Sequence, residues 1–233
     1  MNILAIETTE RIGSVAAMCD GQMLCERDLV HSQRSAQSLA PAVKAVWAEV
    51  GWQPADVDLL AVTIGPGSFT GLRIGITTAK TLAFCCGAEI LGIDTLETIA
   101  AAAPSEIEHL QVAIDAQRNE VVVGSFRRCA DGWFAFEEGG ARLIDIDVWL
   151  ENLQAGSVTA GPILKKLAER LPEGVTALPP EQSRPTAANV ARLAARHYAA
   201  GQRDDVFKLV PVYSRKSAAE EKWEEKSATD KHG

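Results

Sequence analysis

VTIGPGSFTGLRIG, residues 62–75, passes from an apolar, β-branched run into a glycine-rich turn and then into a helical pattern. A strand that ends in such a turn before a helix is typical of an α/β protein, and it leaves backbone amides at the positive end of the helix dipole. The turn is not a P-loop, because it lacks the Lys of G-x-x-x-x-G-K-[ST], and it also departs from G-x-G-x-x-G and G-x-S-x-G. Phosphate binding and a purely structural tight turn both stay open as interpretations.

Strand and helix patterns flank this stretch on both sides. Asp20-Gly21 predicts a two-residue type I′ hairpin turn, because both of its positions need a positive φ. The apolar run 57–64 is typical of a central strand that is covered on both faces. We expect strands at 3–6, 12–18, 23–30, 57–64 and 89–93, and helices at 33–50, from the turn to about 87, and at 95–103.

The same order of strands and then helices restarts after Pro104. Strands are expected at 110–115, 120–127, 133–136 and 157–160, with helices at 145–153, from Gly161-Pro162 to Arg170, and from the capping residue Thr186 to Gly201. Two similar halves of βββαβα order indicate a duplication. The charged segment 214–233 has a single aromatic residue, Trp223, and this composition predicts either a mobile tail or a charged helix that needs a partner.

Composition excludes several classes of protein. The chain has 233 residues, 47% hydrophobic, with 31 acidic against 23 basic residues and a net charge of −8. This is a globular composition, and its acidity argues against autonomous nucleic-acid binding. No apolar run approaches the roughly 20 residues of a membrane helix, and the start reads as a strand. Five cysteines without C-x-x-C and four scattered histidines predict reduced thiols, no metal site and a cytoplasmic location.

The helix after the glycine turn carries a stripe of very small residues at a spacing of four, namely Gly71, Gly75, Ala79 and Ala83. Glycine inside a helix costs about 1 kcal/mol relative to alanine, so two on one face indicate a close approach of another backbone. That backbone belongs either to the sheet of this chain or to a helix of a partner.

Two acids, Glu7 and Asp115, lie at or near the end of the leading strand of their half. Facing one cleft, they would be able to hold a hydrated Mg²⁺ between nucleotide phosphates. The alternative interpretation is that each acid caps a loop or bonds to nearby hydroxyls, such as those of Thr8 and Thr9.

The chain resembles the bacterial TsaB (YeaZ) family in four segments that follow one another in the family's order. They are MNILAIETT at 1–9, GPGSFTGLRIG at 65–75, Ile114-Asp115-Ala116 with Glu120-Val121, and Pro211-Val212-Tyr213-Ser214-Arg215. The resemblance implies the α/β fold of actin, Hsp70 and sugar kinases, with duplicated βββαβα lobes around a cleft. On that fold we expect an N-terminal lobe at 1–103, a C-terminal lobe at 104–185, a helix and closing segment at 186–213, and the tail at 214–233.

The same resemblance implies a role in making N6-threonylcarbamoyladenosine at position 37 of tRNAs that read codons starting with A. TsaB is the non-catalytic member, which pairs with its catalytic paralogue TsaD and is joined by the ATPase TsaE. The tRNA is then reached only through the complex, and no membrane is involved. The paralogue has an H-x-x-x-H metal motif, and its positions match Thr95 and Ile99 here, which implies that no metal is held.

No cofactor is expected on the isolated chain, although ADP or ATP at or near the TsaD interface is compatible with the family. The candidate nucleotide-cleft residues are Glu7, Thr8, Thr9 and Asp115. Pairing in the family runs through two helices of the N-terminal lobe, and the isolated protein is able to form a homodimer. The expected interface residues are Leu39, Val43, Val46, Ser68, Phe69, Thr70, Gly71, Arg73, Gly75 and Ala79. A Gly75→Leu change is expected to abolish pairing and leave a folded monomer.

The competing hypothesis is a stand-alone ATP-binding kinase or ATPase of the same fold. Such an enzyme needs a catalytic base and a phosphate-gripping loop in both lobes. The Glu7-Thr8-Thr9 loop only weakly resembles a phosphate-gripping loop, and no obvious turn of that kind accompanies Asp115. A metalloprotease, the third hypothesis, requires ligands that this sequence does not supply.

Overall fold

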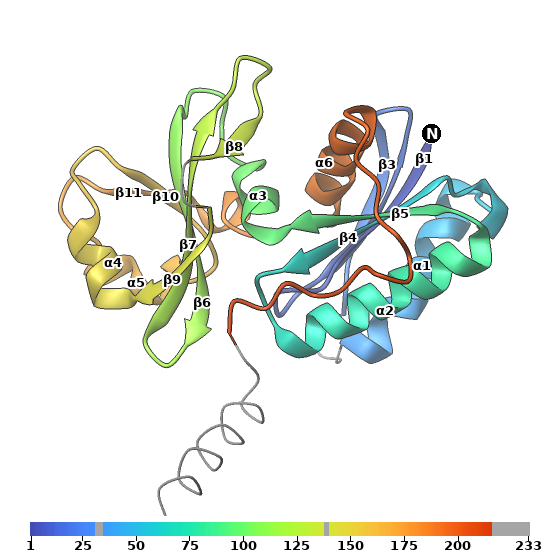
Figure 1. The fold of residues 1–233 in the computed structure, drawn as a ribbon, viewed down its shortest axis with the longest axis horizontal. Coiled ribbons are helices and arrows are strands. Elements are labelled where there is room, and N and C mark those ends of the chain that lie inside the picture. Colours follow the sequence, from blue (N-terminus) through green and yellow to red (C-terminus); the bar gives the residue numbers. More distant parts are fainter. Residues whose placement is uncertain (31–34, 138–139, 216–233) are drawn as a thin grey trace, which may run out of the picture.

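The computed structural model describes residues 1–30, 35–137 and 140–215. Two lobes, each built on its own β-sheet, lie side by side (Figure 1). In the part of the chain that is described, no helix is both long enough and apolar enough to cross a membrane.

The N-terminal lobe has a five-stranded sheet in the order β3-β2-β1-β4-β5. The first hairpin turns at Asp20 and Gly21, whose φ angles of 46° and 81° confirm the predicted turn. β1 runs antiparallel to β2 and parallel to β4. The strands are β1 (Asn2–Glu7), β2 (Ser14–Cys19), β3 (Gln22–Asp28), β4 (Leu59–Gly65) and β5 (Glu89–Asp94).

Helices cover both faces of this sheet, because its strands alternate their side chains between two apolar cores. Leu4 and Ile6 of β1 face the helices α1 (Ser35–Val50) and α2 (Phe69–Cys86). Ile3 and Ala5 face the opposite way, toward α6 (Ala187–Ala199). Helix α6, which comes after the C-terminal lobe in the sequence, therefore returns to complete the N-terminal lobe (Figure 1).

The C-terminal lobe repeats the topology. Its sheet has the order β11-β10-β6-β7-β8, with β9 also paired to β7, so β6, β7, β10 and β11 occupy the places of β1, β2, β4 and β5. This confirms the duplication. The elements are β6 (His109–Gln117), β7 (Glu120–Arg128), β8 (Phe134–Phe136), β9 (Arg142–Asp145), α4 (Ile146–Asn152), β10 (Val158–Ala160), α5 (Leu164–Leu167) and β11 (Thr176–Ala177).

One helix joins the cores of the two lobes. α3 (Thr95–Ala100) follows β5 of the first sheet, but Leu96, Ile99 and Ala100 pack with Leu110 and Phe126 in the core of the second lobe. α3 ends at Ala100, three residues before the predicted end at residue 103. The chain then passes to β6, so α3 marks the point at which the lobes are connected.

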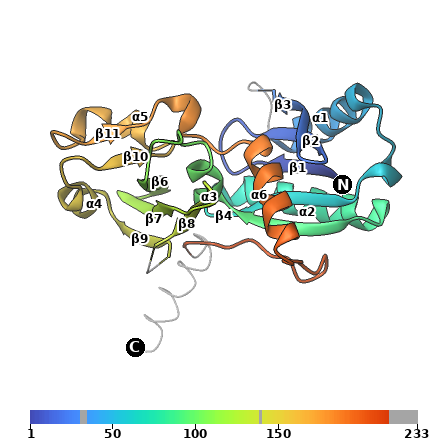
Figure 2. The same ribbon diagram turned by 90° about the horizontal axis from the view of Figure 1, so that it is seen from above.

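A closing segment, residues 204–215, runs back along the N-terminal lobe (Figure 2). Asp204 forms a bridge with Ile90 of β5, and the Lys80 side chain of α2 donates to the carbonyl of Leu209 at 3.0 Å. The Val212 amide then donates to the Ile64 carbonyl at 2.7 Å. Finally, Arg215 reaches the other lobe and bonds to Glu120 of β7 at 2.9 Å.

Several short elements differ from the sequence predictions. β9 and β11 were not predicted, since two to four residues carry too little periodicity to reveal a strand. The helix predicted up to Arg170 is divided between α5 and a 3-10 turn at Ala168–Arg170. The predicted start of the first helix at Gln33, and the tail beyond Arg215, lie outside the described residues.

Candidate functional site

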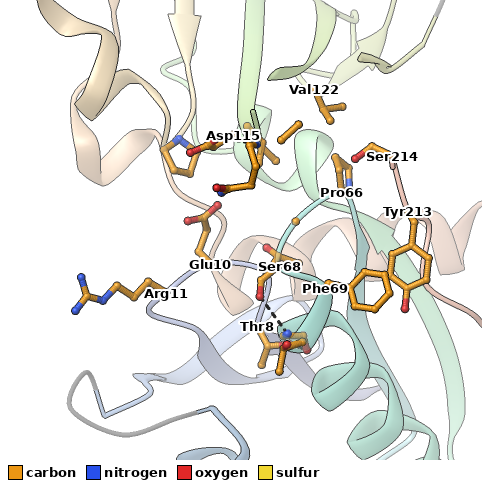
Figure 3. A pocket seen from close by; sticks show the side chains of 18 of the residues that line it. Thr8, Glu10, Arg11, Pro66, Ser68, Phe69, Asp115, Val122, Tyr213 and Ser214 are labelled. Atoms are coloured by element: carbon orange, nitrogen blue, oxygen red, sulfur yellow. Dashed lines mark hydrogen bonds between the residues drawn. The ribbon is translucent and has the colours of Figure 1, made fainter. Parts of the chain in front are cut away.

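A cleft of about 1110 Å³ opens between the two lobes (Figure 3). Its walls come from the loop after β1, the glycine turn before α2, the end of β6, the residues around α5 and the closing segment. Segments that are far apart in the sequence therefore meet at one place, as the fold class predicts.

The glycine turn is built by a close approach to the loop after β1. The Ser68 amide donates to the Thr9 carbonyl at 2.8 Å, and the Ser68 hydroxyl caps α2 by accepting from the Gly71 amide at 3.2 Å (Figure 3). A Cβ on Gly67 would lie 2.5 Å from the Cβ of Thr9, and its φ of 156° is in the region that favours glycine. Two amides of the turn are thus used inside the chain, which supports the structural interpretation of the turn.

Glu7 does not reach the cleft, which corrects the prediction that it binds a cofactor there. Its Oε1 accepts from both the amide and the hydroxyl of Thr9, and its side chain is fully buried. Burial raises the pKa of Glu7 to about 8. The carboxyl group is therefore mostly neutral at pH 7, and it bonds to a nearby hydroxyl as the alternative interpretation proposed.

The two threonines after Glu7 line the cleft but use their hydroxyls elsewhere. The Thr8 hydroxyl donates to the Gly71 carbonyl at 2.8 Å, and that of Thr9 donates to Glu7. Both residues are almost completely buried. Their contribution is to hold the loop against α2, which leaves no hydroxyl of this pair free to donate to a ligand.

Asp115 does lie in the cleft, opposite a residue that the sequence analysis missed. Figure 3 shows Glu10, on the loop after β1, pointing toward Asp115 at the end of β6. Asp115 accepts from the Lys166 ammonium and from the Gln117 amide. Burial raises the pKa of Glu10 to about 7, and the nearby charge of Asp115 adds to the effect. Glu10 follows the strand-ending acid by three residues, and no sequence pattern marks it.

These groups do not fit a Mg²⁺–nucleotide held by this chain alone. Hard divalent cations need several anionic or carbonyl oxygens, yet Glu7 points away from the cleft and Asp115 is already paired with Lys166. Within the described ranges, no three His, Cys, Asp or Glu side chains come together as a metal site.

An aromatic corner closes one end of the cleft. The rings of Phe69 and Tyr213 stack with centroids 4.3 Å apart, and the Arg73 guanidinium lies 4.1 Å from the Phe69 centroid. Arg73 also donates to the Tyr213 hydroxyl at 3.0 Å. The sequence did not predict this contact because 140 residues separate Arg73 from Tyr213.

Six of the ten predicted interface residues lie in the interior, which corrects the predicted contact face. Leu39, Val43 and Val46 of α1 belong to the core between the helices and the sheet, together with Ala79. A Cβ on Gly71 would lie 1.9 Å from the Thr8 carbonyl oxygen, and one on Gly75 would lie 2.2 Å from the Thr8 hydroxyl. The small-residue stripe therefore packs on this chain's own first loop and sheet.

The other four predicted residues lie at the rim of the cleft or beside it. Ser68 and Thr70 are exposed and Phe69 is half-buried, all three lining the cleft, whereas Arg73 is exposed on α2. The outer face of α2 continues with Thr77, Thr81 and Phe84, the last with 70% of its surface exposed.

Comparison with known proteins identifies the relatives. The E. coli (strain K12) "tRNA threonylcarbamoyladenosine biosynthesis protein TsaB" is 32% identical over 229 residues, which cover 94% of this chain and 96% of that protein. The chain belongs to the TsaB family. The Bacillus subtilis (strain 168) protein of the same name is 29% identical over 96% of this chain and 98% of its own length. A family model described as TsaD, tRNA N6-adenosine threonylcarbamoyltransferase, matches residues 29–138.

Solved structures confirm the fold of the TsaB family. YeaZ from Pseudomonas aeruginosa superposes with a TM-score of 0.79 at 29% identity, over 91% of this chain and 99% of that one. The activator of 2-hydroxyisocaproyl-CoA dehydratase from Clostridium difficile gives 0.50 at 9% identity, over 88% and 99%, and shows similarity of fold alone. The fold shared with these structures is a two-lobed α/β fold, with one β-sheet in each lobe.

Proposed function

We propose that this chain is a non-catalytic subunit for the synthesis of N6-threonylcarbamoyladenosine at position 37 of tRNAs that read codons starting with A. It pairs with a TsaD protein, which carries the transferase chemistry, and TsaE joins the pair. The near full-length match to TsaB proteins named for this modification supports the pathway. The tRNA is reached through the complex, consistent with a net charge of −8 on this subunit.

The inward position of Glu7 carries the non-catalytic assignment. Transfer chemistry needs an acid, base or metal that touches the reacting atoms. The first-strand acid, Glu7, is buried away from the cleft and bonds to Thr9, and the second-lobe acid, Asp115, lies in the cleft and bonds to Lys166. The chain's task is then to hold its partner, and any ADP or ATP that the complex uses is bound with the partner's residues.

The outer faces of α1 and α2 are the proposed contact surface. Close packing of helices from two proteins requires small exposed side chains, because these let the backbones approach. α1 presents Ala36, Ala40 and Ala48, and α2 presents Thr77 and Thr81. The proposed surface lies on the same two helices as the predicted one, but it consists of their exposed residues and not of the buried residues that were predicted. A second copy of the chain would use the same surface in the absence of a partner.

Depletion in the native cell tests the proposal. Removing the protein should strongly reduce N6-threonylcarbamoyladenosine in tRNAs that read codons starting with A, as measured by mass spectrometry of nucleosides. Re-expression of the chain should restore the modification, whereas tRNA modifications at other positions should stay unchanged throughout as the control. Normal levels of the nucleoside after depletion would contradict the pathway.

Titration with Mg-ATP separates this proposal from the competing ATPase. The isolated chain should show neither tight binding nor turnover, because Asp115 in its cleft is already paired with Lys166 and burial raises the pKa of Glu10 to about 7, which favours the uncharged carboxyl form. Tight binding together with phosphate release would favour the enzyme.

A further inference from the structure

Among the described residues, four buried polar side-chain atoms of the N-terminal lobe are left without a hydrogen-bond partner, and three of them follow one face of the sheet. These three are Glu7 Oε2, Thr63 Oγ1 and Thr95 Oγ1, and the fourth is Trp47 Nε1 on α1. All three residues have no exposed surface. An unsatisfied buried polar group costs about 1–3 kcal/mol, and native proteins contain few of them. Three such atoms along one face of the sheet therefore call for a physical explanation.

The strand register places two of these atoms on neighbouring strands. β1 and β4 pair in parallel with Ile6 beside Val62, so Glu7 lies beside Thr63 one residue further on. In both strands the residues two and four positions earlier face α6, and these are Ala5 and Ile3 in β1 and Ala61 and Leu59 in β4. Because side chains alternate along a strand, Glu7 and Thr63 continue that same face.

The third atom, Thr95 Oγ1, lies just beyond the end of the next strand, β5. Thr63 pairs with Ile93 of β5, and Ile93 also faces α6. Thr95 comes two residues later, at the first position of α3. The sheet thus presents a row of polar side chains across β1, β4 and the start of α3, at the point where its apolar face ends.

We propose that Glu7, Thr63 and Thr95 form an internal water site beneath the floor of the cleft. A buried water molecule requires two to four polar partners, and the site offers one carboxyl and two hydroxyl groups. Glu7 Oε1 is already used by Thr9, so Oε2 is the atom that faces the water.

Water suits these groups better than a metal ion does. Only one carboxyl group is present, and a divalent cation of the hard class takes about six or more oxygen ligands. Besides burial and the Thr9 hydrogen bonds, the charges that shift the pKa of Glu7 are those of Glu10, which raises it, and Arg184, which lowers it. A neutral carboxyl group is able both to donate a hydrogen bond to water and to accept one from it.

The position gives the site a structural task. Glu7 leads directly into the loop that lines the cleft, and Thr95 begins the helix whose other residues join the core of the second lobe. A water molecule shared between Glu7 and Thr95 connects the loop that lines the cleft to α3, the helix that joins the two lobes. The site thereby positions the Thr8-Thr9 loop, and it is independent of which partner the chain binds.

The sign of the stability change in Thr63→Val tests the site. Valine has the outline of threonine without the hydroxyl. If water satisfies the hydroxyl, the change breaks a hydrogen bond, and the unfolding equilibrium constant should rise about fivefold. If the hydroxyl is dry and unpaired, the change relieves a desolvation cost, so an unchanged or lower constant would overturn the proposal. Thr95→Val should behave in the same way.

Thr98→Val provides the calibration. This neighbouring buried threonine donates to the Asp94 carbonyl at 2.8 Å, so its replacement measures the loss of one direct hydrogen bond in the same helix. The double variant Thr63→Val/Thr95→Val should be less destabilised than the sum of its single changes, because both hydroxyls share the water. If the destabilisation of the double variant equals the sum of the two single changes, the two hydroxyls do not share a water molecule.

Diffraction from crystals of the full chain gives a second readout that does not depend on a variant folding. The expected result is a density peak within hydrogen-bonding distance of Glu7 Oε2 and both hydroxyls. A site without density, or direct contact among the three side chains, would overturn the proposal. Exchanging NaCl for KCl or MgCl₂ at equal ionic strength should leave the unfolding midpoint unchanged. Stabilisation by one cation alone would show that an ion, not water, occupies the site.

Discussion

At the scale of single residues, burial decides what each polar group is able to do. Glu7 and Asp115 occupy matching places in the two lobes, yet Glu7 is sealed inside and Asp115 is open to the cleft. The sequence predicted both acids, and it left open whether they serve a ligand or the loop. Solvent access resolves that choice, and it depends on how α2 packs over the loop, which no local pattern encodes.

The buried acid predicts a particular dependence of stability on pH. The pKa of Glu7 is about 8 in the folded protein against 4.5 for an exposed glutamate, so the folded state holds the proton more tightly. Its contribution to stability is complete below pH 4.5 and is lost as the pH rises toward 8.

Glu7→Gln should remove that dependence. From pH 5 to pH 7, the unfolding constant of the unchanged protein should rise relative to that of the variant by about tenfold per pH unit, measured by urea unfolding. The comparison is needed because burial raises the pKa values of Glu10 and Asp94 as well, and these titrate with the same sign. Parallel profiles for the two proteins would show that Glu7 is not protonated when folded.

Gly71→Ala tests the close packing of α2 on the first loop. A new Cβ would meet the Thr8 carbonyl oxygen at 1.9 Å, and backbone cannot yield as a flexible side chain does. We expect a destabilisation of about 1–3 kcal/mol in urea unfolding, although alanine is the better helix former. Thr77→Ala, on the exposed face of the same helix, is the control and should not destabilise. Equal stability of both variants would contradict the packing.

The close approach of Thr8 to α2 also revises an expectation from the sequence. Gly75→Leu was expected to leave a folded monomer, but a Cβ there would already lie 2.2 Å from the Thr8 hydroxyl. That variant should lose stability before it reports on pairing, so it is unsuitable as an interface probe.

At the scale of elements, length decides what the sequence reveals. The long strands and the helices α1, α2 and α6 carry enough periodicity to be predicted within a few residues of their observed bounds. β9 and β11 exist because β7 and β10 offer them edges to pair with. The spacing of the small residues located one face of α2 correctly, but it did not reveal whether that face turns inward.

Thr77→Arg tests the proposed contact surface. Thr77 lies on the exposed face of α2, so a long charged side chain there should leave the fold intact and block a close helix contact. Affinity for the TsaD partner, measured by titration calorimetry, should fall at least about tenfold, equivalent to 1.4 kcal/mol.

Val148→Arg on α4 is the matched control, since Val148 is 49% exposed on a helix of the other lobe. It should bind the partner like the unchanged protein. If both variants bind equally well, the contact surface lies elsewhere than on the outer face of α2.

At the scale of the whole molecule, the two lobes, their duplication and the cleft follow from the order of elements together with the family resemblance. The closing segment does not, because it is held by contacts across long sequence separations, such as Val212 with Ile64 and Arg215 with Glu120. It supplies one wall of the cleft and touches both lobes. The result is a two-lobed fold in which the acid at the end of the first strand holds its own loop.

Reconstitution with purified components tests the central claim most directly. Threonylcarbamoyl transfer to an unmodified tRNA is measured in the presence of an activated threonylcarbamoyl donor. The assay is run with this chain alone, with its TsaD and TsaE partners alone, and with the three together. We expect transfer only when the chain and its partners are combined. Transfer by this chain alone would contradict its non-catalytic role, and undiminished transfer by the partners without it would contradict the requirement for this chain.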